Sequence, residues 1–178
     1  MKFRVVAIIG LSLFAGACAT PAEVKNMVVD TPRNIEPKDP ALKHGMCVTS
    51  VEGGEETNPL WTSQVDNASF KAALEGSLKA QMLLAEPPAN CSFSLRAHLL
   101  GLNQPSFGFN MTVGSNVNYE VTKSGSDIVY LAHSQSASYT ATVGQAFAGV
   151  ERLRLANEGS IKENIRQFIS ALLRHTPG

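Results

Sequence analysis

The residues of this 178-residue chain that are best suited to chemistry are its three cysteines, Cys18, Cys47 and Cys91. A thiol can pair in a disulfide, bind a metal ion or carry a covalent lipid. In an exported protein, an odd number of cysteines leaves one thiol without a disulfide partner. Export would therefore require that one of the three has a separate role.

The first 17 residues have the organisation of a secretory signal peptide. Lys2 and Arg4 form a basic start, residues 5–14 form an apolar run, and small residues follow. The run is too short to read as a helix that spans a bilayer. We therefore expect residues 1–17 to be removed during export.

The residues Ala15-Gly16-Ala17-Cys18 resemble the lipobox of bacterial lipoproteins, with Ala15 at a position where that family usually carries Leu. In lipoproteins the cysteine sulfur receives diacylglycerol and the freed amine is acylated, for example with palmitate. The resemblance thus implies lipidation of Cys18, which leaves the other two cysteines free to pair. Ala19 follows instead of Asp, and by resemblance to lipoproteins of enteric bacteria this implies an outer-membrane anchor with the domain facing the periplasm.

Cleavage by the ordinary signal peptidase is the alternative. The same small residues satisfy its small-x-small rule, with a cut before Cys18 or before Thr20. The product would then be secreted or periplasmic and carry no lipid.

Other residue types give no pattern that indicates catalysis or a metal site. The histidines lack metal-ligand spacing, and Ser124-Gly125-Ser126 has the composition of a hairpin turn rather than of a nucleophile elbow. Glu158 stands four residues before Lys162, which predicts a surface ion pair on a helix. We expect no enzymatic activity, no cofactor and no metal. The four histidines are His44, His98, His133 and His175.

Hydrophobic periodicity predicts an α+β fold. Residues 18–44 contain four prolines among polar residues and predict an extended tether after the lipidated cysteine, followed by a single domain over 45–175. Within the tether, the apolar group Met27-Val28-Val29 could pack on the domain and order part of the segment. Apolar and polar residues alternate in the strand candidates, as in an antiparallel sheet covered on one face. Two helices with one apolar stripe each would cover that face. The order is strand 46–51, helix 68–85, strands 91–99, 111–121 and 128–141, and helix 146–174.

Two of the cysteines are predicted to lie on neighbouring strands. Cys47 falls in the first strand and Cys91 at the start of the second, so an oxidising compartment would allow a disulfide between them. The alternative is two buried thiols on strands that are not neighbours. Whether paired or free, Cys47 and Cys91 would have a structural role.

Three aromatic residues are candidates for contact with a partner. Phe107 and Phe109 lie in a loop between two strands, and Trp61 lies in a loop before the first long helix. The phenylalanines could equally tuck under the edge of the sheet. Asn157 and Asn164 lie on or beside the core-facing stripe of the last helix, where we expect them to bond strand ends.

The element order and both helices resemble small envelope lipoproteins of Gram-negative bacteria. "FKAALEGSLKAQMLL" and "RLANEGSIKENIRQFISALL" are similar to helices of YajG-like lipoproteins, and the element order also resembles the lipopolysaccharide-assembly lipoprotein and auxiliary lipoproteins of ABC-type lipid transporters. The resemblance implies a non-catalytic structural or adaptor component in cell-envelope assembly or transport, anchored by its acyl chains and partnered by an envelope protein. A periplasmic protein that binds a small or lipidic ligand is the alternative. The chain has equal numbers of basic and acidic residues, 15 of each, which gives no support to a nucleic-acid partner.

Overall fold

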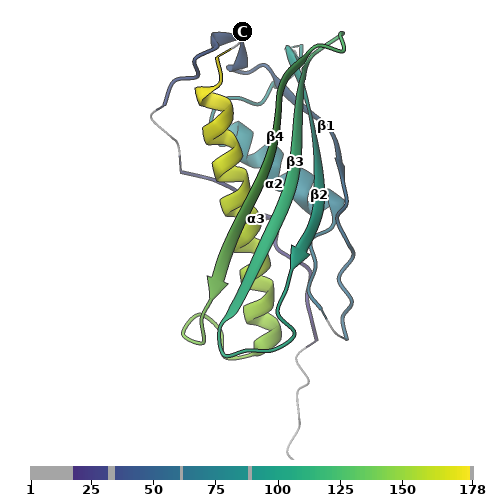
Figure 1. The fold of residues 1–178 in the computed structure, drawn as a ribbon, viewed down its shortest axis with the longest axis vertical. Helices are drawn as coiled ribbons and strands as arrows, with labels where there is room; N and C mark the ends of the chain where they lie inside the picture. Colours follow the sequence, from purple (N-terminus) through teal and green to yellow (C-terminus); the bar gives the residue numbers. More distant parts are fainter. Residues whose placement is uncertain (1–17, 32–34, 61, 88–89, 177–178) are drawn as a thin grey trace, which may run out of the picture.

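The computed structural model describes residues 18–31, 35–60, 62–87 and 90–176, so the predicted signal peptide lies outside the described residues. Four strands form one sheet, and helices cover it (Figure 1). The elements are α1 (Val24–Met27), the 3₁₀ helix η1 (Pro40–Leu42), β1 (Met46–Glu52), α2 (Asn67–Ala80), β2 (Phe93–Asn103), β3 (Met111–Lys123), β4 (Val129–Ala141) and α3 (Gly149–Arg174).

The sheet has the order β1-β2-β3-β4 and is mixed. β2 pairs antiparallel with β3, and β3 pairs antiparallel with β4, but β1 pairs parallel with β2. The predicted α+β order is therefore confirmed, and the prediction that every pairing is antiparallel is wrong at β1. The reason is the position of α2 between the two strands, because a crossover helix returns the chain to the end from which the first strand started.

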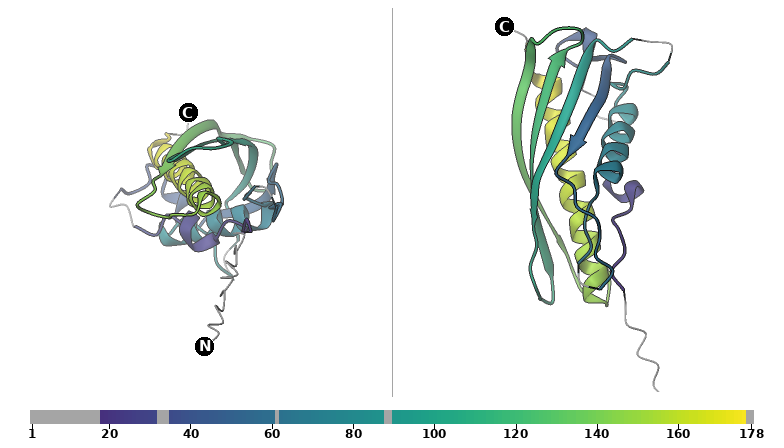
Figure 2. Two further views of the ribbon diagram at one scale, coloured as in Figure 1. Left: turned by 90° about the horizontal axis from the view of Figure 1, so that it is seen from below. Right: turned by 90° about the vertical axis from the view of Figure 1, so that its right-hand side faces the viewer.

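The helices cover one face of the sheet, as the sequence predicts. α3 packs against β3 and β4, while α2 packs against β1, and the sheet curves around α3 (Figures 1 and 2). The rings of Tyr119 and Phe168 stack at the centre, with their centroids 3.9 Å apart. Large buried side chains of this core include Phe70, Leu74, Leu78, Leu95, Ile161 and Ile165.

Asn164 fixes the position of α3 over the sheet. Its side-chain amide donates to the carbonyl oxygens of Ser115 in β3 and Gln135 in β4, at 3.2 and 3.0 Å, and its oxygen accepts from the hydroxyl of Tyr119 at 2.9 Å. A buried polar group is tolerated when it is fully hydrogen-bonded, and such bonds are directional. The expected bonding of Asn164 to strands is thus present, near the middle of β3 rather than at its end.

α2 is shorter than the periodicity predicts. The helix ends at Ala80 rather than near Ala85, and Met82 takes a positive φ of 57°. The backbone beyond it pairs with the start of β1, since Met46 donates to the carbonyl of Leu83 at 2.9 Å and accepts from Ala85 at 2.8 Å. This tertiary pairing replaces the last predicted turn of helix.

The segment predicted as an extended tether packs largely on the domain. Met27 and Leu42 are fully buried, and Ala22 and Val29 join the same core. α1 contacts both α2 and α3. These residues therefore pack on the domain rather than extend away from it, as the sequence allows for Met27-Val28-Val29, because burial of their apolar side chains is favourable.

Candidate functional site: the end of the domain at Cys18

Cys18 lies exposed at the point where the described fold begins. The next residue is already part of the domain, because the amide of Ala19 donates to the carbonyl oxygen of Pro59 at 2.9 Å and Ala19 itself is buried. The lipobox residues Ala15 to Ala17 lie outside the described residues. A lipid on Cys18 would thus join the domain with almost no spacer.

Hydrogen bonds tie the residues after Cys18 to the loop between β1 and α2. The hydroxyl of Ser63 donates to the carbonyl of Thr20 at 2.7 Å, and the amide of Ala22 donates to the carbonyl of Gln64 at 3.3 Å. Further along, the amide of Val29 donates to the buried hydroxyl of Ser77 in α2 at 2.9 Å. The segment is therefore held at both of its ends.

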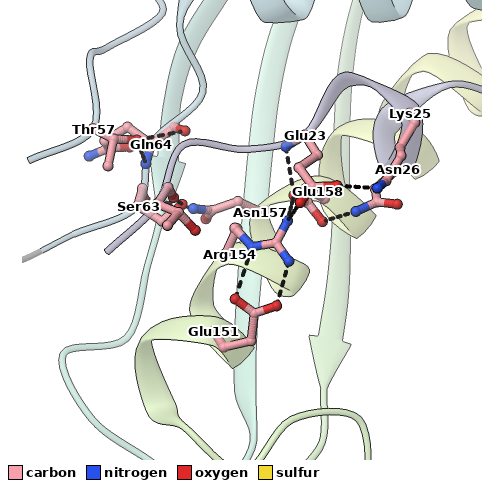
Figure 3. Close-up of polar contacts among 11 residues, drawn as sticks. Glu23, Lys25, Asn26, Thr57, Ser63, Gln64, Glu151, Arg154, Asn157 and Glu158 are labelled. Atoms are coloured by element: carbon pink, nitrogen blue, oxygen red, sulfur yellow. Dashed lines mark hydrogen bonds and ion pairs between the residues drawn. The ribbon is translucent and has the colours of Figure 1, made fainter. Parts of the chain in front are cut away.

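Charged side chains of α3 bind the middle of this N-terminal segment, at Glu23 and Asn26 (Figure 3). The carboxylate of Glu158 accepts from the amide of Glu23 at 2.7 Å and from the side chain of Asn26 at 2.9 Å. Arg154 donates to Glu158 at 2.6 Å and also contacts Glu23 and Glu151. The predicted surface pair of Glu158 with Lys162 is wrong, because the side chain of Glu158 is only 2% exposed and Lys162 instead contacts Asp30.

The protonation of this cluster follows from its contacts. Burial raises the pKa of Glu158, against the effect of its hydrogen bonds and of Arg154. The hydrogen bond from Arg154 lowers the pKa of Glu151. Arg154, bonded to Glu151, has its pKa raised and remains a cation. The cluster therefore acts as a clamp that holds α1 against α3.

A second polar group lies next to this clamp and joins three segments. Asn157 donates to the carbonyl of Ser63 at 2.7 Å and accepts from the side chain of Gln104 at 2.8 Å. Gln104 also donates to the carbonyl of Ser63 at 3.0 Å. Asn157 in α3 is fully buried, so the start of the loop between β2 and β3 is fixed to the loop between β1 and α2.

The two phenylalanines predicted as contact residues project from the β2–β3 loop into solvent. Phe107 and Phe109 are each 87% exposed, so the alternative that they tuck under the sheet is wrong. Trp61 lies outside the described residues. The sequence reading missed Phe147, which is 92% exposed, and Leu60, which is 80% exposed. A search for large apolar residues in loop stretches without charged residues, such as 57–63 and 142–148, would have found both.

Arg152 braces the two loops that carry these phenylalanines. Its guanidinium donates to the carbonyl oxygens of Ala146 and Phe147, at 2.9 and 2.5 Å, and to that of Gly108 at 3.3 Å. A small apolar core lies nearby and includes Met111, Val113, Ala141 and Leu153. The loops are therefore fixed parts of the fold.

Cys47 and Cys91 form a disulfide with a Cα–Cα distance of 5.6 Å. Cys47 lies in β1, and Cys91 lies two residues before β2, which pairs with β1. The bond is at the end of the sheet opposite to the loops that carry Phe107 and Phe147, since it lies at the amino ends of β1 and β2.

The described residues contain no group of three or more His, Cys, Asp or Glu side chains that could hold a metal ion. His98 and His133 line a shallow hollow of about 440 Å³ on the outer face of the sheet, together with Arg96 and Glu120. His175 lies against the ring of Tyr130, with centroids 4.8 Å apart. Within the same ranges, none of the helices combines the length and the hydrophobicity that a bilayer-spanning segment requires.

Comparison with known proteins identifies the fold. No family model and no curated protein matches the chain. A Xanthomonas campestris protein described under the family DUF330 has 10% identity and a TM-score of 0.55, over 81% of this chain and 92% of that one. A hypothetical protein from Chlamydia trachomatis has 10% identity and a TM-score of 0.51, over 74% and 98%.

A third solved structure is that of a candidate lipoprotein from Caulobacter crescentus, with 11% identity and a TM-score of 0.48 over 75% of this chain and 91% of that one. At such identities the first two matches show a shared fold and nothing more. The TM-score of the third is too low to show a shared fold. The finer resemblance to YajG-like, lipopolysaccharide-assembly or transport-auxiliary lipoproteins stays a prediction.

Proposed function

We propose that this chain is an outer-membrane lipoprotein, triacylated on Cys18, with its domain in the periplasm. Its role is non-catalytic, as a structural or adaptor component of cell-envelope assembly or transport with an envelope protein as partner. The observation that carries the proposal is the exposure of Cys18 directly beside the buried Ala19. A thiol at this point is accessible for modification, and a lipid there needs no rearrangement of the fold.

The polar groups near Cys18 support a role in architecture. Arg154 pairs with Glu23, Glu158 accepts from the amide of Glu23, and Asn157 donates to the carbonyl of Ser63, so each bonds a group of another segment. They join α3 to the N-terminal segment and to two loops. A protein that holds a partner at a fixed distance from a membrane needs a domain whose segments are bonded to one another in this way.

A ligand-binding protein is the second candidate. The hollow on the outer sheet face carries Arg96, Glu120 and two histidines, which could bind a polar group. It is shallow and open, whereas small-molecule sites usually bury most of their ligand. We therefore rank it below the adaptor role.

Intact mass and membrane fractionation of the protein from wild-type and Cys18→Ala cells test the proposal. We expect a triacyl mass increment and outer-membrane partition in the wild type, and loss of both in the variant. An unmodified chain that begins at Cys18 or Thr20 in the soluble fraction would contradict the lipoprotein assignment. Ligand screens against the sheet-face hollow would then be the next experiment.

A further inference from the structure

We propose that the end of the domain at Cys18 docks directly on the lipid surface, with Phe107, Phe109, Phe147 and Leu60 entering the membrane interface. The proposal rests on the lipidation of Cys18 proposed above. It goes beyond that function because it assigns a second lipid contact to the folded domain itself. The acyl chains then fix where the protein is, and the aromatic loops fix how it is oriented.

The topology brings these four side chains to one end of the molecule. Phe107 and Phe109 lie between the end of β2 and the start of β3, and Phe147 lies between the end of β4 and the start of α3. Leu60 follows β1, which runs parallel to β2 and so ends at the same end. The views of Figures 1 and 2 show the loops gathered there, beside the point where the described chain begins.

The exposure of these side chains is built into the fold. Arg152 holds the backbone at Gly108, Ala146 and Phe147. Gln104 and Asn157 hold the adjacent loop bases. The phenylalanines therefore project outward from a braced backbone. Large apolar side chains that are exposed together on a soluble surface mark an interaction site.

The charge pattern matches a lipid interface. Residues 57–63, 104–110 and 142–148 contain no Asp, Glu, Lys or Arg, although Glu55 and Glu56 precede the first of these stretches. The opposite end is highly charged. Its turns and connections carry Glu36, Lys38, Asp39, Lys43, Lys123 and Asp127. Burial of charge in a bilayer interface is costly, so the end that carries these three uncharged stretches is the better suited of the two to such contact.

The position of the anchor favours a lipid surface over a protein partner. Ala19 is bonded to Pro59, one residue before Leu60. A diacylglycerol on Cys18 must lie in the bilayer, so the loop that carries Leu60 is drawn to within a few residues' length of the lipid headgroups. A protein partner at this end would have to displace the membrane to which the domain is attached.

Tryptophan scanning of the full lipidated protein tests this docking. Trp61→Phe supplies a background without the native tryptophan, and Phe107→Trp or Phe147→Trp then places one reporter in each loop. Ile128→Trp is the matched control, because Ile128 is exposed in the turn at the opposite end. Each protein is reconstituted in vesicles of phosphatidylethanolamine and phosphatidylglycerol with brominated acyl chains, and its lipid attachment is checked by intact mass.

We expect brominated lipid to quench the tryptophans at 107 and 147 and to leave the tryptophan at 128 unquenched. No quenching in proteins whose mass shows the lipid would overturn the docking proposal while the lipoprotein assignment stands. Absence of the lipid by mass would instead overturn the assignment on which the proposal rests. Protection of 107 and 147 from iodide without quenching by brominated lipid would show a protein in that place, such as a second copy, and would also overturn the proposal.

A second measurement uses the unlipidated protein. Cys18→Ala chains lack the acyl contribution, so their weak partition into the same vesicles reports the loops alone. Phe107→Ser or Phe147→Ser should lower that partition by about tenfold each, as expected for a fully exposed aromatic side chain that becomes buried in lipid. Ile128→Ser is the matched control, and an equal loss in it would contradict the proposal.

Discussion

The guanidinium of Arg154 lies 2.6 Å from the carboxylate of Glu158, four residues along the same helix, and both side chains are less than 10% exposed. A helical pair at this spacing ordinarily lies on the surface and contributes little to stability. Here the N-terminal segment covers the pair, and Glu158 also accepts the amide of Glu23. The pair therefore links the helix to the segment that begins at the candidate lipidation site.

Removal of the cation should weaken that link strongly. Arg154→Met leaves the carboxylate of Glu158 buried without its cation, and we expect a loss of about 3–5 kcal/mol in the free energy of unfolding. Urea unfolding measures this loss. Hydrogen exchange should also show faster exchange of the amide of Glu23, whose acceptor is the carboxylate of Glu158, and of the amides of Ala22 and Val28 in the same segment.

Two further variants control this prediction. Lys162→Met removes only the exposed contact with Asp30 and should cost less than about 1 kcal/mol. In the double variant Arg154→Met with Glu158→Gln, the neutral amide oxygen can still accept from Glu23, so part of the loss should return. Equal costs for Arg154→Met and Lys162→Met would show that the clamp contributes nothing.

The aspartate at the start of α2 should make stability depend on acid pH. Burial would raise the pKa of Asp66, but hydrogen bonds from the hydroxyl and amide of Ser69 outweigh it and lower the pKa. The contribution of Asp66 is therefore complete above the ordinary aspartate pKa of about 3.9 and is lost as the pH falls through the lower folded-state value. Unfolding free energies measured between about pH 6 and about pH 2 test this window.

Asp66→Asn and Asp66→Ala separate charge from capping. Asparagine caps helices about as well as aspartate, so Asp66→Asn should keep most of the stability while flattening its dependence on acid pH. Asp66→Ala should cost about 1 kcal/mol at neutral pH. An acid-dependent loss that is unchanged in Asp66→Asn would assign it to other carboxylates.

The disulfide should be a large part of the stability of the domain. Cys47 and Cys91 are separated by 44 residues, and closing a loop of this length stabilises the fold by roughly 4 kcal/mol in the chain-entropy model. We expect the double variant Cys47→Ser with Cys91→Ser to unfold at correspondingly lower urea. Alkylation of the unreduced protein, followed by mass analysis, should label neither residue, and two labelled thiols would contradict the bond.

How far the sequence predicts this molecule depends on the range of the interactions involved. The strands and α3 can be predicted from the sequence. The alternation of apolar and polar residues in β3 and the apolar stripe of α3 each show, within one element, which face is buried. The parallel pairing of β1 and the early end of α2 cannot be predicted from such local patterns. Both depend on contacts between residues far apart, such as Met46 with Leu83.

Only part of the candidate site can be predicted from the sequence, for the same reason. Cys18, Phe107 and Phe109 stand out by residue type within their own stretches of sequence. Phe147 and Leu60 gain meaning only when the topology places them beside the others. Arg154 and Lys162 both lie four residues from Glu158, so spacing alone cannot choose between them, whereas the packing of the N-terminal segment on Glu158 buries it with Arg154.

If Cys18 carries the proposed lipid, the packing of the residues after it also sets the height of the domain above the membrane. α3 has 26 residues, which corresponds to a length of about 39 Å at 1.5 Å per residue, and it runs between the two ends of the domain (Figure 1). Because the fold begins directly after Cys18, a lipid on that residue would hold the charged turn between β3 and β4 at nearly constant height above the membrane. A binding partner would meet that turn at one fixed level and in one orientation.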